Sequence, residues 1–70
     1  MKSSELLRRL RKYAAMRGIA VELKPAKGSH HKLVVGGRST ILAMHGTEIP
    51  KGTLGKILKD LDIREADLYE

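Results

Sequence analysis

Apolar residues recur at helical spacing near the start of the chain. The stretch SSELLRRLRKYAAMRG predicts a helix over residues 3–18. Its apolar positions are Leu6, Leu7, Leu10 and Ala14. We expect Ser3 or Ser4 to cap the helix, because a short hydroxyl side chain accepts a hydrogen bond from the free N–H groups of a first turn. Gly18 is well placed to end the helix in the left-handed conformation.

Apolar and polar residues then alternate, as they do in strands with one buried face. Three strands are expected, over residues 19–24, 30–35 and 38–44. Pro25 is expected to end the first strand, and the segment AKGS carries the following turn. Gly36 and Gly37 predict a hairpin with a type I′ turn, because that turn needs a positive φ at both central residues.

Helical periodicity returns near the end of the chain, after the loop HGTEIPKGTL. The apolar positions of this helix are Leu54, Ile57, Leu58 and Leu61. The tail, residues 62–70, predicts a short helical turn with Asp62 as its cap and Glu65 three residues later. The order α-β-β-β-α over residues 1–70 predicts a single α+β domain. We expect a three-stranded antiparallel sheet with both helices on one face, the layout of a double-stranded-RNA-binding-like fold.

Charge is distributed unevenly over the chain, whose formal net charge is +6. Residues 1–61 hold 13 bases and 4 acids, a net of +9, while residues 62–70 hold one base and four acids, a net of −3. A body this basic attracts polyanions, so we expect a nucleic-acid partner. With only two tyrosines as aromatics, charge, shape and hydrogen bonds must replace base stacking. A DNA reader is disfavoured because the chain has neither Asn nor Gln.

Cysteine usage and hydropathy exclude several other classes. The chain has no cysteine, which rules out disulfides and thiolate zinc sites and fits a reducing compartment. No apolar run approaches the roughly 20 residues that span a bilayer, and the N-terminal segment lacks a signal-peptide core. We therefore expect a cytoplasmic protein with no membrane contact and no cofactor.

The segment KGSHHK, residues 27–32, carries the candidate chemistry. Alternation along a strand places His30 with Lys32 on the open side of the sheet, and His31 with Leu33 on the helix-covered side. A metal site is disfavoured because adjacent strand residues point apart. The third histidine, His45, has no histidine at chelating spacing and is read as a loop residue.

A histidine in a basic setting suits acid–base chemistry on RNA. Neutral imidazole can take a proton from a 2′-hydroxyl, which then attacks the adjacent phosphate. The segment IPKGTL adds the free N–H groups of a helix start, the ammonium of Lys51 and the hydroxyl of Thr53. From the residues alone, the alternative is that His30 is a surface residue without chemistry.

With these motifs in place, the chain resembles the HicA toxin family, the ribonuclease half of HicB–HicA toxin–antitoxin pairs. The resemblance rests on SSELLRRL, KGSHHK and IPKGTLGKILKDLDI, in that order. It implies a metal-independent mRNA interferase of the double-stranded-RNA-binding-like fold, held inactive by a HicB-like antitoxin. It also implies that the catalytic residue is the histidine directly after Gly-Ser, which is His30.

On this reading His30 is the general base and His31 a supporting residue. The expected RNA or phosphate contacts are Lys27, Gly28, Ser29, Lys32, Lys51 and Thr53. Gly28 is expected mainly to let the backbone turn and approach the phosphate. The alternative function is a non-catalytic RNA-binding module of the same fold, which would bind RNA without cleaving it.

Overall fold

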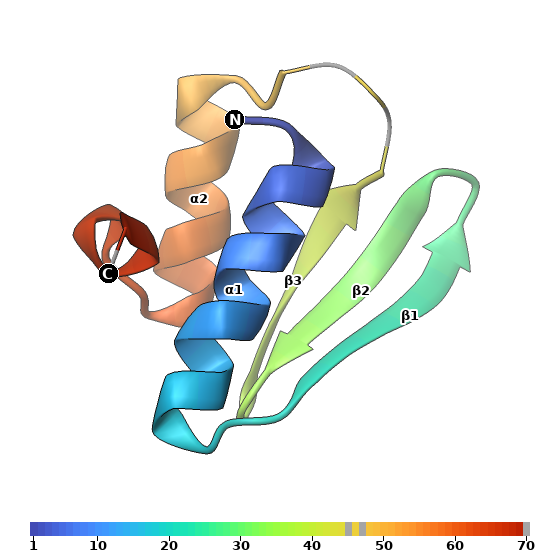
Figure 1. Cartoon of the computed structure of the whole chain (residues 1–70). Coiled ribbons are helices and arrows are strands. Elements are labelled where there is room, and N and C mark those ends of the chain that lie inside the picture. The colour runs from blue at the N-terminus through green and yellow to red at the C-terminus, as the bar shows by residue number, and fades with distance from the viewer. Residues whose placement is uncertain (45, 47, 70) are drawn as a thin grey trace.

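The computed structural model describes residues 1–44, 46 and 48–69. Its elements are α1 (Ser3–Arg17), β1 (Val21–Lys27), β2 (His30–Val35), β3 (Arg38–Ala43), α2 (Lys51–Leu61) and the short 3-10 helix η1 (Glu65–Tyr69). The strands form an antiparallel sheet in the order β1-β2-β3, and both helices lie on one side of it (Figure 1). The predicted α-β-β-β-α order and the three-stranded antiparallel sheet are confirmed.

The central strand β2 determines which side chains face the helices. Leu33 is fully buried and lies in register between Leu23 of β1 and Thr40 of β3. The next residue back, Lys32, is exposed. Because side chains alternate along a strand, one set of β2 positions serves the core and the other set faces away from the helices.

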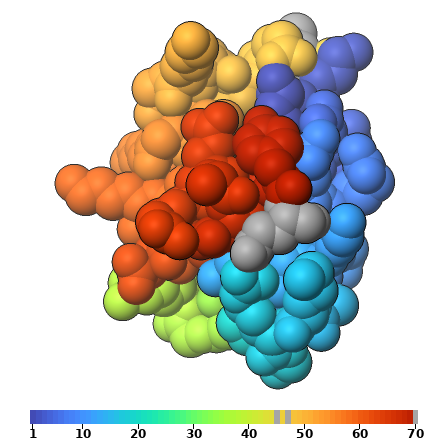
Figure 2. Space-filling view, turned by 60° about the vertical axis from the view of Figure 1, so that its left-hand side comes forward, coloured from blue at the N-terminus to red at the C-terminus, as the bar shows by residue number. Residues whose placement is uncertain are grey.

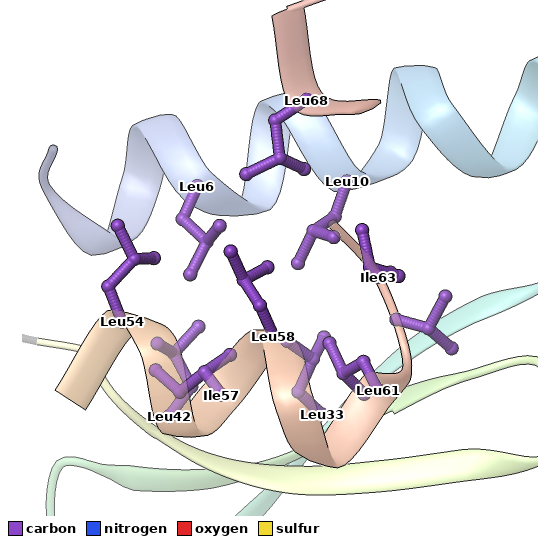
Figure 3. Close-up of a cluster of buried hydrophobic side chains, with 11 residues drawn as sticks. Leu6, Leu10, Leu33, Leu42, Leu54, Ile57, Leu58, Leu61, Ile63 and Leu68 are labelled. Atoms are coloured by element: carbon purple, nitrogen blue, oxygen red, sulfur yellow. The ribbon is translucent and has the colours of Figure 1, made fainter. Parts of the chain in front are cut away.

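A single cluster of aliphatic side chains joins the helices to the sheet (Figure 3). Its buried members are Leu6, Leu10, Leu33, Val35, Leu42, Leu54, Ile57, Leu58, Leu61, Ile63 and Leu68. Full burial of one such side chain contributes about 1.5–3 kcal/mol to folding. The cluster therefore holds α1, α2 and the covered face of the sheet together.

The segment after α2 covers the seam between the two helices, on the side away from the sheet (Figure 2). Leu68 of η1 is buried in the core. Arg9 Nη1 donates a hydrogen bond to the carbonyl of Leu68 at 3.3 Å, and its guanidinium lies 4.6 Å from the ring centroid of Tyr69. The predicted short helical turn is therefore present and is fastened to α1.

The predicted cap of that turn is wrong. Asp62 instead ends α2, in the left-handed conformation with φ 57°. The N–H of Asp62 bonds the carbonyl of Lys59 at 3.1 Å, and that of Ile63 bonds Leu58 at 2.9 Å. These two bonds satisfy carbonyls at the end of α2, a role that glycine usually fills.

The start of α1 also differs from the expectation. The N-cap residue is Lys2, and no side chain caps the helix. Ser3 is instead buried, and its Oγ donates a 2.6 Å hydrogen bond to the carbonyl of Ala43. Ser3 therefore ties the helix to the end of β3 rather than capping it. Gly18 ends the helix at φ 67° as predicted.

Strand β1 runs further than the sequence suggests, through Pro25 to Lys27. Pro25 pairs with His31, and the register shifts between Pro25 and Lys27, as in a β-bulge. Proline is tolerated here because β1 is an edge strand, and only one side of it takes part in the ladder. The strand begins at Val21 rather than at position 19, because the N–H of Ile19 bonds a carbonyl of α1.

The glycine hairpin is confirmed, but its predicted turn type is wrong. Val35 and Arg38 are paired, so residues 36 and 37 form a two-residue loop. Only Gly36 has a positive φ, 63°. A positive φ at the first central position alone is the pattern of a type II′ turn.

No helix among the described residues is long and apolar enough to cross a membrane.

A polar link anchors α2 to the sheet beside the core. Thr40 Oγ1 donates to Asp60 Oδ2 at 2.9 Å, and Lys56 Nζ donates to the same oxygen at 2.9 Å. The bond from Lys56, and then that from Thr40, lower the pKa of Asp60 below its ordinary value of 3.8. The folded chain therefore favours the ionised carboxylate.

Asp60→Asn is expected to lower the free energy of unfolding near neutral pH and to matter less in acid. A carboxyl whose pKa is lowered on folding contributes stability above its unfolded pKa of 3.8, and loses it as the pH falls through the folded pKa. Urea unfolding of wild type and variant at about pH 7 and about pH 3 measures this. Glu65→Gln, at an exposed position of η1, is the charge-matched control. An Asp60→Asn effect of equal size at both pH values would contradict the assignment.

Candidate functional site

The predicted site lies on the face of the sheet that the helices leave uncovered. Among the rows of paired residues that project from this face, the two nearest the β1–β2 turn are Lys27–His30–Ala43 and Lys24–Lys32–Ile41. Paired residues on neighbouring strands project from the same face. His30 and the lysines of these rows are all exposed. The structure thus places His30 on the open side among three lysines, on the side that strand alternation predicts.

Charge on this face is only partly compensated. Lys24 Nζ lies 3.5 Å from a carboxylate oxygen of Glu22 on the same strand. Among residues 1–44, 46 and 48–69, no ion pair or hydrogen bond engages the ammonium of Lys27 or Lys32. The 3-10 helix η1 of the acidic tail lies over the helices, on the far side of the core, while Asp62 is paired with Arg38 at the start of β3, 3.8 Å away. The open face is therefore the natural place for an anionic ligand.

The turn before His30 is built from Gly28 and Ser29, between the paired residues Lys27 and His30. Gly28 has φ 59°, which only glycine adopts without strain, and nothing lies within 4 Å of the place where a Cβ would stand. The carbonyl of Ser29 accepts a 2.8 Å hydrogen bond from the N–H of Met44. The turn is therefore held against the end of β3.

His31 lies on the opposite face from His30. It is half-buried, in one row with Pro25 and Leu42. Its Nδ1 is 3.1 Å from the carbonyl oxygen of Ser29. The two adjacent histidines therefore have separate environments, and they do not converge on one ligand.

The start of α2 holds the other two predicted residues. Pro50 is the N-cap, no side chain caps this helix, and the first N–H groups of any helix lack partners within it. Lys51 is exposed at the first position. Thr53 lines a hollow of about 280 Å³, together with Ala43 and Pro50.

His30 and the start of α2 are near one another in the fold without being joined. The starts of β2 and α2 lie at the same end of the molecule (Figure 1). Ala43 is the strand partner of His30 and also lines the hollow beside Thr53. In the described part of the chain, however, no hydrogen bond connects His30 to Lys51 or Thr53. The structure thus brings together Lys27, His30 and Lys32 on one face, with the start of α2 nearby but not hydrogen-bonded to His30.

Comparison with known proteins decides the family. The model of the family described as "HicA toxin of bacterial toxin-antitoxin" matches residues 4–63. The chain belongs to the HicA toxin family. No curated protein and no solved structure matches it. This HicA chain is therefore a toxin of a toxin–antitoxin system, and the matched range includes both His30 and the start of α2.

Reasoning from the sequence missed one of the lysines on the open face of the sheet. Lys24 lies directly opposite Lys32 in the register and so shares the face of His30. Side chains alternate along β1, so Lys24 points away from the core next to the half-buried Leu23. The pairing with Lys32 depends on the register, which is offset at the bulge between Pro25 and Lys27.

Potential metal ligands are dispersed in the described residues. No group of three or more His, Asp or Glu side chains is placed to hold an ion within residues 1–44, 46 and 48–69. His45 lies outside the described residues, so its predicted role as a loop residue stays a prediction.

Proposed function

We propose that this HicA toxin is an endoribonuclease that cleaves RNA without a metal, with His30 as its general base. The observation that carries the proposal is the position of His30. It is exposed on the uncovered face, paired with Lys27, and Lys32 is the next β2 residue on that same face. A neutral imidazole accepts protons near neutral pH, and flanking ammonium groups hold a phosphate within its reach.

The reaction is a transesterification within the RNA. The imidazole of His30 removes the proton of a 2′-hydroxyl, and the 2′-oxygen forms a bond to the adjacent phosphorus. The bond from phosphorus to the 5′-oxygen breaks, and that oxygen takes up a proton, which the protonated His30 returns directly or through water. The products are a 2′,3′-cyclic phosphate and a 5′-hydroxyl, so atoms and charge balance without a cofactor.

The remaining predicted residues divide between the reacting phosphate and its neighbours. Lys27 and Lys32 share the face of His30 and are assigned to the reacting phosphate and the next one. Gly28 and Ser29 form the turn that lets the RNA backbone approach. Lys51 and Thr53 form no hydrogen bond or ion pair with His30 in the described structure, so we assign them to a phosphate further along the strand.

His30→Ala is expected to lower the cleavage rate by about 100- to 10,000-fold, because one positioned base contributes that much. The measurement is cleavage of single-stranded RNA in EDTA by wild type and variant, with RNA affinity followed separately. Affinity should change little. A substrate with a 2′-deoxy sugar at the scissile position is the matched control and should resist both proteins. Wild-type cleavage by His30→Ala would overturn the assignment, and RNA binding without any cleavage would favour the non-catalytic module.

Lys27→Ala and Lys32→Ala are expected to weaken RNA binding and to reduce the slope of log affinity against log salt by about 1 each. Lys59→Ala removes the same charge from an exposed position of α2 and serves as the control. The measurement is the RNA affinity of wild type and the three variants at a series of salt concentrations, from which each slope is obtained. If Lys59→Ala changes the slope as much as the two strand variants, the open face is not the RNA-binding surface.

We also propose that the partner of this toxin is a HicB-like antitoxin that covers the open face. Membership of a toxin–antitoxin family supports an antitoxin, and the charge of this face supports an acidic one. Ile41 lies on the same face, is 52% exposed, and offers an apolar contact among the lysines. An antitoxin bound there blocks access of RNA to His30.

Lys32→Glu is expected to weaken binding of a neutralising HicB-like antitoxin by about tenfold or more, because it places like charges across the contact. Lys59→Glu carries the same charge change on the helix layer and should bind normally. Titration calorimetry with the purified antitoxin gives both values. Unchanged affinity of Lys32→Glu, or RNA cleavage by the intact complex, would show that the antitoxin binds elsewhere.

A further inference from the structure

The carbonyl oxygen of Ser29, at the end of the sheet, has two hydrogen-bond partners. It accepts one hydrogen bond from the N–H of Met44 at 2.8 Å and a second from His31 Nδ1 at 3.1 Å. Ser29 is the residue directly before His30. The peptide group that leads into the proposed general base is thus held from two sides.

The second of these bonds fixes the tautomer of His31. A carbonyl oxygen only accepts hydrogen bonds, so Nδ1 of His31 carries the proton. In the neutral ring Nε2 is then unprotonated. In this state His31 serves as a donor to the turn.

His31 occupies a position whose pattern calls for an apolar residue. It lies on the helix-covered face, two residues before the buried Leu33 and opposite the buried Leu42. A leucine there would extend the core, whereas an imidazole gains less from apolar contact. The bond from the ring to the Ser29 carbonyl explains why a polar residue stands here. That bond holds the backbone directly before His30.

His30 itself depends on its backbone for its orientation. Its ring has no hydrogen-bond partner among the described residues. Its strand partners are Lys27 and Ala43, and the carbonyl of Ala43 is in turn bonded by Ser3 Oγ at 2.6 Å. A displacement of about 1 Å at a reacting group can lower a rate by as much as 100-fold.

We propose that His31 is a positioning residue for His30. Its Nδ1–H holds the Ser29 carbonyl, and so fixes the backbone from which the general base projects onto the open face. This inference rests on the proposed function, and it assigns to His31 no contact with RNA.

The decisive test is a pair of amide substitutions. In His31→Asn the side-chain nitrogen stands where Nδ1 does and can donate to Ser29, whereas in His31→Gln it stands one atom further out. At saturating RNA, His31→Asn is expected to retain the wild-type cleavage rate within about twofold. His31→Gln and His31→Ala should be about fivefold slower, the factor that one hydrogen bond of ordinary strength supplies, with unchanged RNA affinity.

A second measurement does not depend on cleavage. Nitrogen-15 NMR of the wild-type imidazoles above pH 7 should show the Nδ1–H tautomer for His31. The Nε2–H tautomer, or equal rates for His31→Gln and wild type, would overturn the inference while leaving the proposed function intact. Equal impairment of His31→Asn and His31→Gln would also overturn it. A wild-type chain that fails to cleave RNA overturns the proposed function, and this inference with it.

Discussion

The structure depends on the burial of only one face of the sheet. Three strands and one layer of helices leave no second layer, so every strand must send its apolar side chains the same way. β2 satisfies this with Leu33 and Val35 in the core. Since strand residues alternate, His30 and Lys32 must then face outward. A slip of one residue in the register would bury the lysine and expose the leucine, so the core itself enforces the position of the candidate site.

Much of the fold follows from periodicity, and the departures have local causes. Helix and strand positions were evident from the spacing of apolar residues. The extension of β1 through Pro25 was not evident. Proline lacks an N–H and so disfavours a strand bonded on both sides, but β1 lies at the edge of the sheet, where proline is tolerated. Ser3 looked like a cap but bonds β3, a partner 40 residues away. Asp62 ends α2 in a conformation that glycine favours and that aspartate adopts less often, so its role as a possible cap of the next turn was the more obvious expectation.

The candidate site was predictable to the extent that it lies on one strand. Alternation alone assigned His30 to the open face and His31 to the covered face. That no hydrogen bond in the described part of the chain joins His30 to Lys51 or Thr53 could not be inferred, because it depends on how the helix layer packs over the sheet. The contribution of Lys24 depends on cross-strand register, and the bond from His31 to Ser29 depends on the shape of one turn. Sequence patterns carry little information about cross-strand register or about the shape of a turn.

The segment around Leu68 and Tyr69 has a consequence for how this toxin tolerates change. It lies beyond the range that the family shares, and it is fastened to α1 through Leu68 and the contacts of Arg9. The full thickness of the core separates it from the lysine-bearing strands. Sequence drift in η1 is therefore separated by the core from the lysine-bearing face of the sheet, whereas it reaches the start of α2, where Glu65 and Tyr69 line a hollow together with Lys51.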